Sequence, residues 1–164
     1  KIAFKDNLNS KKLEAMRGTT NLLHLGAQLE FYFFNMVEFE NEKEPFHFNP
    51  FVSFGGGLNY YDTKAYSTLG EVGLIATTFE KFTFPSEGRK YSVSTESKFT
   101  YSIATNVGTR LNVARGHDII IDARFQYFFS DWIDGLNPNR ELYPENVTND
   151  TFIGINIGYI YYFD

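Results

Sequence analysis

The side chains best suited to catalysis in this sequence are three histidines, His24, His47 and His117. A hydrolase built on histidine needs the imidazole beside a nucleophile and a carboxylate at one level of the fold. His24 falls on the polar face of an alternating segment, His47 lies just before another segment, and His117 falls in a short turn. These places do not converge, so we expect each histidine to be solvated or to fill the interior. No enzyme signature remains, and we expect a non-catalytic protein.

Two further features resemble ligand sites without completing one. Asp131 and Asp134 flank Trp132, but the remaining ligand positions of a calcium loop are missing. We expect these acids to cap a turn and Trp132 to lie at a membrane boundary. The glycine run 55–57 lacks the helix and the lysine of a phosphate loop, and is expected to permit strand curvature. Cysteine is absent, which excludes thiolate sites, and we expect neither metal nor cofactor.

The composition narrows the class of protein. The 164 residues suffice for one domain, and a formal charge of -5 without a basic stripe argues against a nucleic-acid partner. Aromatic residues make up 18% of the chain although its mean hydropathy is -0.30. A soluble domain with so many rings would normally bury them among more aliphatic side chains. No apolar run approaches the length of about 18 residues that a transmembrane helix requires.

Five segments alternate apolar and polar residues with a period of two, which puts the two kinds on opposite faces of a strand. The apolar rows carry no charge, and aromatic rings gather near their ends, as an interfacial girdle requires. The segments exceed the usual strand of about 5 to 6 residues and suit the tilted strands of about 9 to 11 residues that cross a bilayer. They cover residues 23–33, 52–61, 99–113, 119–130 and 152–163.

A soluble sandwich or lipocalin-like barrel would also alternate, with its polar face wet. Such a face should be rich in Lys, Glu and Thr, whereas here it holds Gly and Asn with few charges, which suits a narrow lumen. The connections at about 35–45 and 114–117 are shorter than those at about 62–97 and 131–150. Outer-membrane barrels alternate in this way between periplasmic turns and outer loops.

These observations predict an all-β fold, a transmembrane antiparallel up-and-down β-barrel in a bacterial outer membrane. Residues 1–6 resemble the end of a strand running outward, with residues 7–19 as an outer loop. An even number of strands with a periplasmic N-terminus then requires at least two more strands, and eight is the economical total. We therefore expect residues 1–164 to form a single, N-terminally incomplete barrel domain in contact with outer-membrane lipid.

A narrow lumen leaves room for side chains alone. If the hairpin loop is centred on Gly116, the parity of the apolar rows sets the register. The resulting pairs are Arg110 with Asp122, Gly108 with Arg124, and Asn106 with Gln126. An arginine–carboxylate pair satisfies both desolvated groups. We expect a lumen network that plugs the barrel, with an ion-selective channel as the alternative; its members are Glu30, Arg110, Asp122 and Arg124.

Several stretches resemble the PorG-like outer-membrane barrels of Bacteroidota, which are related to type IX secretion. The run Ser130, Asp131, Trp132, Ile133 and Asp134, after Phe129, is similar to that family's Thr-Asp-Tyr-Leu-Asp-Asp motif. Residues 21–34 also look similar, and residues 49–65 match its Pro-aromatic-x-x-x-Gly-Gly-x-x-Tyr pattern. The chain departs from the family at Trp132, where Tyr is usual, and at Gly135, where Asp is common. The segment from about Tyr66 to Arg89 has no clear counterpart.

The resemblance implies an anchoring protein of a secretion and gliding-motility machinery that associates with a periplasmic PorK/PorN ring. The periplasmic contact would come from two charged segments, although on sequence alone a solvated turn is the better explanation of their charges. Their residues are Glu38, Glu40, Glu42, Lys43, Glu44, Arg115 and His117. The alternatives are a small outer-membrane pore, a general OmpA-like structural barrel and a membrane-embedded hydrolase.

Overall fold

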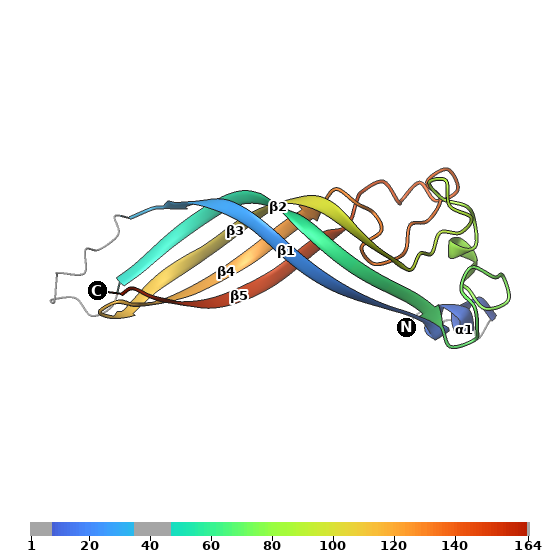
Figure 1. Cartoon of the computed structure of the whole chain (residues 1–164), viewed down its shortest axis with the longest axis horizontal. Coiled ribbons are helices and arrows are strands. Elements are labelled where there is room, and N and C mark those ends of the chain that lie inside the picture. Colours follow the sequence, from blue (N-terminus) through green and yellow to red (C-terminus); the bar gives the residue numbers. More distant parts are fainter. Residues whose placement is uncertain (1–7, 35–46, 164) are drawn as a thin grey trace, which may run out of the picture. The chain divides into compact units, whose positions relative to one another are not determined.

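A computed structural model describes residues 8–34 and 47–163 of the chain. Five strands form one curled antiparallel sheet in which sequence neighbours are also spatial neighbours (Figure 1). The elements are α1 (Leu8–Ala15), β1 (Met16–Tyr32), β2 (His47–Ser67), the 3-10 helix η1 (Glu80–Phe82), β3 (Glu96–Ala114), β4 (His117–Phe128) and β5 (Thr151–Tyr161). The all-β prediction is confirmed, and each alternating segment lies largely within one strand. The strand predicted at residues 1–6 lies outside the described residues.

The first two strands are longer than the alternation indicated. β1 begins at Met16 and is preceded by α1, where the sequence had predicted an outer loop over residues 7–19. β2 continues to Ser67, so the connection that follows it covers residues 68–95. The hydroxyls of Thr20 and Thr63, which lie in these extensions, both donate to the carbonyl of Ile133, at 2.7 and 2.6 Å. The two strands therefore continue beyond their apolar rows, where polar side chains hold them by hydrogen bonds. Hydrophobicity alone does not mark the ends of these strands.

The described residues divide into two compact units. Unit 1 contains residues 8–24, Leu58–Tyr101 and Phe128–Asp150, and unit 2 contains residues 25–34, 47–57, 102–127 and 151–163. Strands β1, β2 and β3 each contribute several residues to both units, and β4 contributes its last residue, Phe128, to unit 1. Unit 1 holds the two long connections, whereas unit 2 holds the short turn between β3 and β4.

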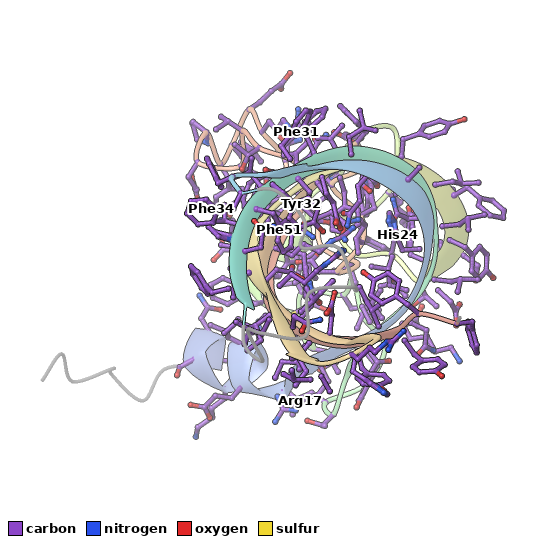
Figure 2. The ribbon with its side chains drawn as sticks, turned by 90° about the vertical axis from the view of Figure 1, so that its left-hand side faces the viewer. Arg17, His24, Phe31, Tyr32, Phe34 and Phe51 are labelled. Atoms are coloured by element: carbon purple, nitrogen blue, oxygen red, sulfur yellow. The ribbon has the colours of Figure 1, made fainter. Side chains whose placement is uncertain are left out.

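On the central strands, the buried side chains are mostly polar and the exposed side chains are mostly apolar. On β3, Ser102 and Asn106 are 2% and 3% exposed, whereas Tyr101 and Val107 are 68% and 62% exposed. On β2, polar Ser53, Asn59 and Thr63 are buried, and apolar Phe54, Leu58 and Tyr60 are exposed. Figure 2 shows the same division at the end of β1, with Tyr32 on the inner side of the ribbon and Phe31 on the outer side. A water-soluble core has the opposite arrangement.

The register of β4 and β5 continues the apolar rows from one strand to the next. Ile121 lies opposite Ile157, and Ala123 lies opposite Ile155. The polar pair Asp122 and Asn156 falls between them on the other face. The two outer rows therefore form one continuous apolar surface across these strands.

The turn between β3 and β4 departs from the predicted register. The sequence had placed Arg110 opposite Asp122, but a Cβ on Gly108 would lie 2.8 Å from the Cα of Asp122, so Gly108 is the residue that faces Asp122. Gly116 takes a positive φ of 71°. A left-handed glycine is typical of the last position of a three-residue hairpin loop. The prediction was wrong because it put Gly116 at the centre of the loop.

Candidate functional site

The inner face of unit 2 carries a cluster centred on Arg110 of β3. One guanidinium nitrogen donates to the Tyr162 hydroxyl at 3.0 Å, and another lies 3.5 Å from a Glu30 carboxylate oxygen. Its Nε lies 3.9 Å from Asp118, and its Cζ lies 4.7 Å from the centre of the Tyr32 ring. We call Arg110, Glu30, Asp118, Tyr162 and Tyr32 the Arg110 cluster.

The members of the Arg110 cluster also bind one another. The Tyr162 hydroxyl donates to Asp118 at 3.2 Å, and the Tyr32 hydroxyl donates to Glu30. Asp118 accepts a further hydrogen bond of 2.8 Å from Asn112. The side chains of Arg110 and Asp118 are only 14% and 7% exposed. Charged groups with so little exposure are stable only when paired in this way.

The Arg110 cluster also requires the sheet of unit 2 to curl. Glu30 and Tyr32 belong to β1 and Tyr162 follows β5, and these strands are the two edges of the sheet. Neighbouring strands lie about 4.8 Å apart, so the edges of a flat five-stranded sheet would be about 19 Å apart. One guanidinium touches both edges only if they bend toward each other. The inner face is therefore concave, and Arg110 extends across it.

The hydrogen bonds described for the other two predicted members of the lumen network are to residues outside the Arg110 cluster. Asp122 accepts a hydrogen bond of 2.8 Å from Asn156, and Arg124 donates to Gln126 of its own strand at 3.0 Å. Glu30 and Arg110, both members of the predicted network, lie beside each other, although the predicted register paired Arg110 with Asp122. The sequence interpretation missed Asp118, Tyr32 and Tyr162. Placing Gly116 at the last position of the hairpin loop would have predicted that Asp118 lies close to Arg110. Tyr162 reaches Arg110 because the sheet of unit 2 curls, and no local sequence pattern indicates that curl.

The predicted loop motif, residues 130–134, lies at the centre of the unit 1 connections. Trp132 is 6% exposed and packs with Tyr61, Phe128 and Ile133, so its predicted place at a membrane boundary is wrong. Its indole nitrogen donates to Glu87 at 3.0 Å, and the guanidinium of Arg89 lies 3.9 Å from its ring. Two residues of the preceding long connection thus hold this tryptophan. That contact joins irregular loops, and nothing in the sequence signals it.

The acids of this motif have structural partners. Asp134 accepts from the backbone nitrogen of Leu136 at 2.8 Å, so one of the two acids caps the turn as predicted. Asp131 accepts hydrogen bonds from Arg140 and Asn146, which oppose the burial that raises the pKa of Asp131. Asp150 accepts from the backbone nitrogen of Ile133 at 2.7 Å. Burial first, and then the charge of Asp134, raise the pKa of Asp150 to about 6. Within residues 8–34 and 47–163 there is no group of three metal-binding side chains.

The histidines have separate partners. His24 Nδ1 lies 2.7 Å from the amide oxygen of Asn59 in unit 1. His117 in unit 2 is hydrogen-bonded to the Tyr159 hydroxyl, and its ring centre lies 5.0 Å from that of Tyr161. The side chain of His47 lies outside the described part of the chain. The described histidines are therefore each joined to a neighbouring strand.

The predicted periplasmic contact is described only in part. Glu38, Glu40, Glu42, Lys43 and Glu44 lie outside the described residues. Arg115 is exposed at the turn between β3 and β4, and His117 packs against β5 as given above. Arg115 is thus the described member of the set that is free to meet a partner at this turn.

Comparisons with protein-family models, with curated proteins and with solved structures found no match to this chain. Among the described residues, no helix is both long and apolar enough to cross a membrane.

Proposed function

We propose that this protein is an outer-membrane β-barrel with a non-catalytic, anchoring role. The observation that carries the proposal is the inverted burial of its strands. Ile153, Ile155 and Ile157 of β5 are 77%, 79% and 77% exposed, whereas the polar side chains of the central strands face inward and are buried. Burying apolar surface is the main favourable term of folding, so such rows must meet an apolar medium.

The extent of the apolar rows supports lipid as that medium. Monomeric soluble proteins rarely expose contiguous apolar patches larger than a few hundred Å². Here exposed apolar residues recur on all five strands, for example Leu25, Phe54, Ile103, Phe125 and Ile155. Because no charge interrupts the rows, a bilayer accommodates them without desolvating an ion.

The edge strands support a barrel with more strands than the five described. Inward-facing residues of the central strands, such as Asn59 and Gln126, are 0% and 4% exposed. Their counterparts on the edges, Gln28 of β1 and Asn156 of β5, are exposed. An exposed strand edge in lipid would leave backbone groups unpaired, so only closed barrels span membranes. We propose closure by further strands, to a total of eight.

The anchoring role is supported by the interior and by the resemblance to PorG-like proteins. The Arg110 cluster fills the inside of unit 2 with paired charges, which suits a structural barrel better than an open pore. By that resemblance, the partner would be a periplasmic ring of the PorK/PorN kind. The exposed Arg115 at the short turn is the described residue best placed to meet it.

Membrane location and partnership are tested by separate measurements. We expect the full chain to sediment with outer membranes and to resist extraction by carbonate, because its apolar rows are in lipid; recovery in the soluble fraction would contradict the proposal. In mild detergent, mass spectrometry should then identify co-purifying periplasmic proteins. Arg115→Glu should reduce their recovery, whereas the matched control Arg17→Glu, on the exposed start of β1, should not. Recovery of the wild type as a lone monomer would contradict the anchoring role.

A further inference from the structure

The Arg110 cluster occupies the inside of unit 2 from one edge of its sheet to the other. Arg110 reaches β1 through Glu30, β4 through Asp118 and the segment after β5 through Tyr162. The ring of Tyr32 lies beneath the guanidinium and is itself 5.5 Å from the ring of Phe51, centre to centre. In a barrel of about eight strands the interior is only as wide as the side chains that fill it. A single side chain with contacts on both sides therefore controls whether ions can pass.

We propose that the Arg110 cluster is an ionic lock that closes a cation-selective path through the barrel. This inference rests on the proposed membrane-spanning barrel and adds a regulated element to it. The lock is held by one long side chain and not by a continuous apolar core. Its removal would leave space lined by polar groups, and not a dry cavity.

The cation preference follows from the charges that line the inner face. The described inward-facing charges of unit 2 include the carboxylates of Glu30, Asp118 and Asp122 and the guanidiniums of Arg110 and Arg124. With Arg110 in place, the acids are only slightly in excess. Without it, Glu30 and Asp118 lose their shared counter-ion and face the path together. A ring of carboxylates in a pore attracts cations and excludes anions.

Two neutral polar atoms on the same face indicate that side-chain packing leaves polar groups of the interior unpaired. Ser53 Oγ and Asn106 Oδ1 are buried, and neither has a hydrogen-bond partner among the described residues. Buried polar atoms are usually satisfied by protein groups or by ordered water. The inner wall of unit 2 thus contains polar groups that the packing of its side chains leaves without partners.

The lock is tested by planar-bilayer recordings of the wild type, Arg110→Met and the control Arg17→Met. Methionine keeps much of the length of arginine and removes its charge and donors. We expect the wild type and Arg17→Met to be silent, because Arg17 is exposed at the start of β1 and does not belong to the Arg110 cluster. Arg110→Met should show resolved openings with about a tenfold preference for K⁺ over Cl⁻, a factor equivalent to about 1.4 kcal/mol. Adding Glu30→Gln and Asp118→Asn to Arg110→Met should abolish that preference.

Tyr162→Phe provides a second variant in case Arg110→Met does not fold. It keeps the ring but removes the hydroxyl that joins Arg110 to Asp118, and it should produce briefer openings of the same selectivity. Insertion is scored separately in the same lipid by heat-modifiable gel mobility and protease protection. A wild type that does not insert contradicts the proposed membrane barrel. Inserted variants that stay silent, or a wild type that conducts as Arg110→Met does, overturn the lock.

Discussion

Replacing Ile155 by arginine distinguishes lipid from water at the outer surface of β5. Ile155 is 79% exposed and close to the middle of the strand, which runs from Thr151 to Tyr161. In water, a substitution at so exposed a site changes the free energy of unfolding by at most about 0.5 kcal/mol. On the lipid face of a barrel, arginine at the bilayer midplane costs about 2 to 4 kcal/mol. The expected loss in the free energy of unfolding is therefore several-fold larger in lipid than in water.

The depth of each position along β5 supplies the control. A rise of about 3.3 Å per residue and a tilt of about 45° give about 2.3 Å per residue along the bilayer normal. The 11 residues of β5 then span about 25 Å, which equals the height of the apolar band of such barrels. Ile155 falls about 2 Å from the midplane, and Thr151, on the same face, about 12 Å from it. We expect Thr151→Arg to cost no more than about 1 kcal/mol.

The assay is reversible urea unfolding in phospholipid vesicles, followed by far-ultraviolet circular dichroism and by gel mobility. Both variants are compared with the wild type under identical conditions. A large loss of stability for Ile155→Arg beside a small one for Thr151→Arg supports lipid contact. Equal and negligible effects at both positions would refute it.

Two further predictions concern the loops and the tight packing of the strands. Because the pKa of Asp150 is raised to about 6, the folded protein holds that proton more tightly than the unfolded chain does. The free energy of unfolding of unit 1 should therefore rise by about 1 kcal/mol as the pH falls from 7.5 to 5, after allowance for solvent screening. Asp150→Asn should remove this dependence in urea titrations followed by the fluorescence of Trp132, the only tryptophan; an unchanged pH profile would count against it. Gly108→Ala should lower the free energy of unfolding by about 1 to 3 kcal/mol, because the new Cβ would lie 2.5 Å from the Cβ of Asp122. Gly158→Ala should be tolerated, because a Cβ there would lie 3.8 Å from its nearest neighbouring atom. Equal unfolding midpoints for the two alanine variants would contradict the strand packing described here.

The strands could be predicted from the sequence because their alternation is a local pattern. Apolar and polar residues on β3 alternate from Phe99 to Val107, and their exposure alternates in step. The ends of β1 and β2 could not be predicted, because their extensions are held by hydrogen bonds to Ile133, far away in the sequence. The apolar rows therefore predict part of each of these strands and not its full length.

The Arg110 cluster could be predicted only in part. Inward-facing charges in a narrow interior placed Glu30 and Arg110 in one predicted network, but the predicted register paired Arg110 with Asp122 and not with Glu30. The remaining partners depended on the position of Gly116 within its loop. When the centre of the loop shifts by one residue, each residue of β3 faces a residue of β4 two positions away from its previous partner. The packing of Arg89 and Glu87 around Trp132 had no sequence signal, because both connections are irregular and meet only in the folded chain.

Contact between lipid and the outer rows of the strands is tested most directly by a spin-label scan along β5 in vesicles. The sequence contains no cysteine, so Ile155→Cys, Asn156→Cys and Ile157→Cys each give a single labelling site. Labels at residues 155 and 157 should be readily accessible to oxygen and shielded from a water-soluble nickel complex. The label at residue 156 should show the opposite preference. Strong broadening by nickel at residues 155 and 157 would place those rows in water and contradict the account.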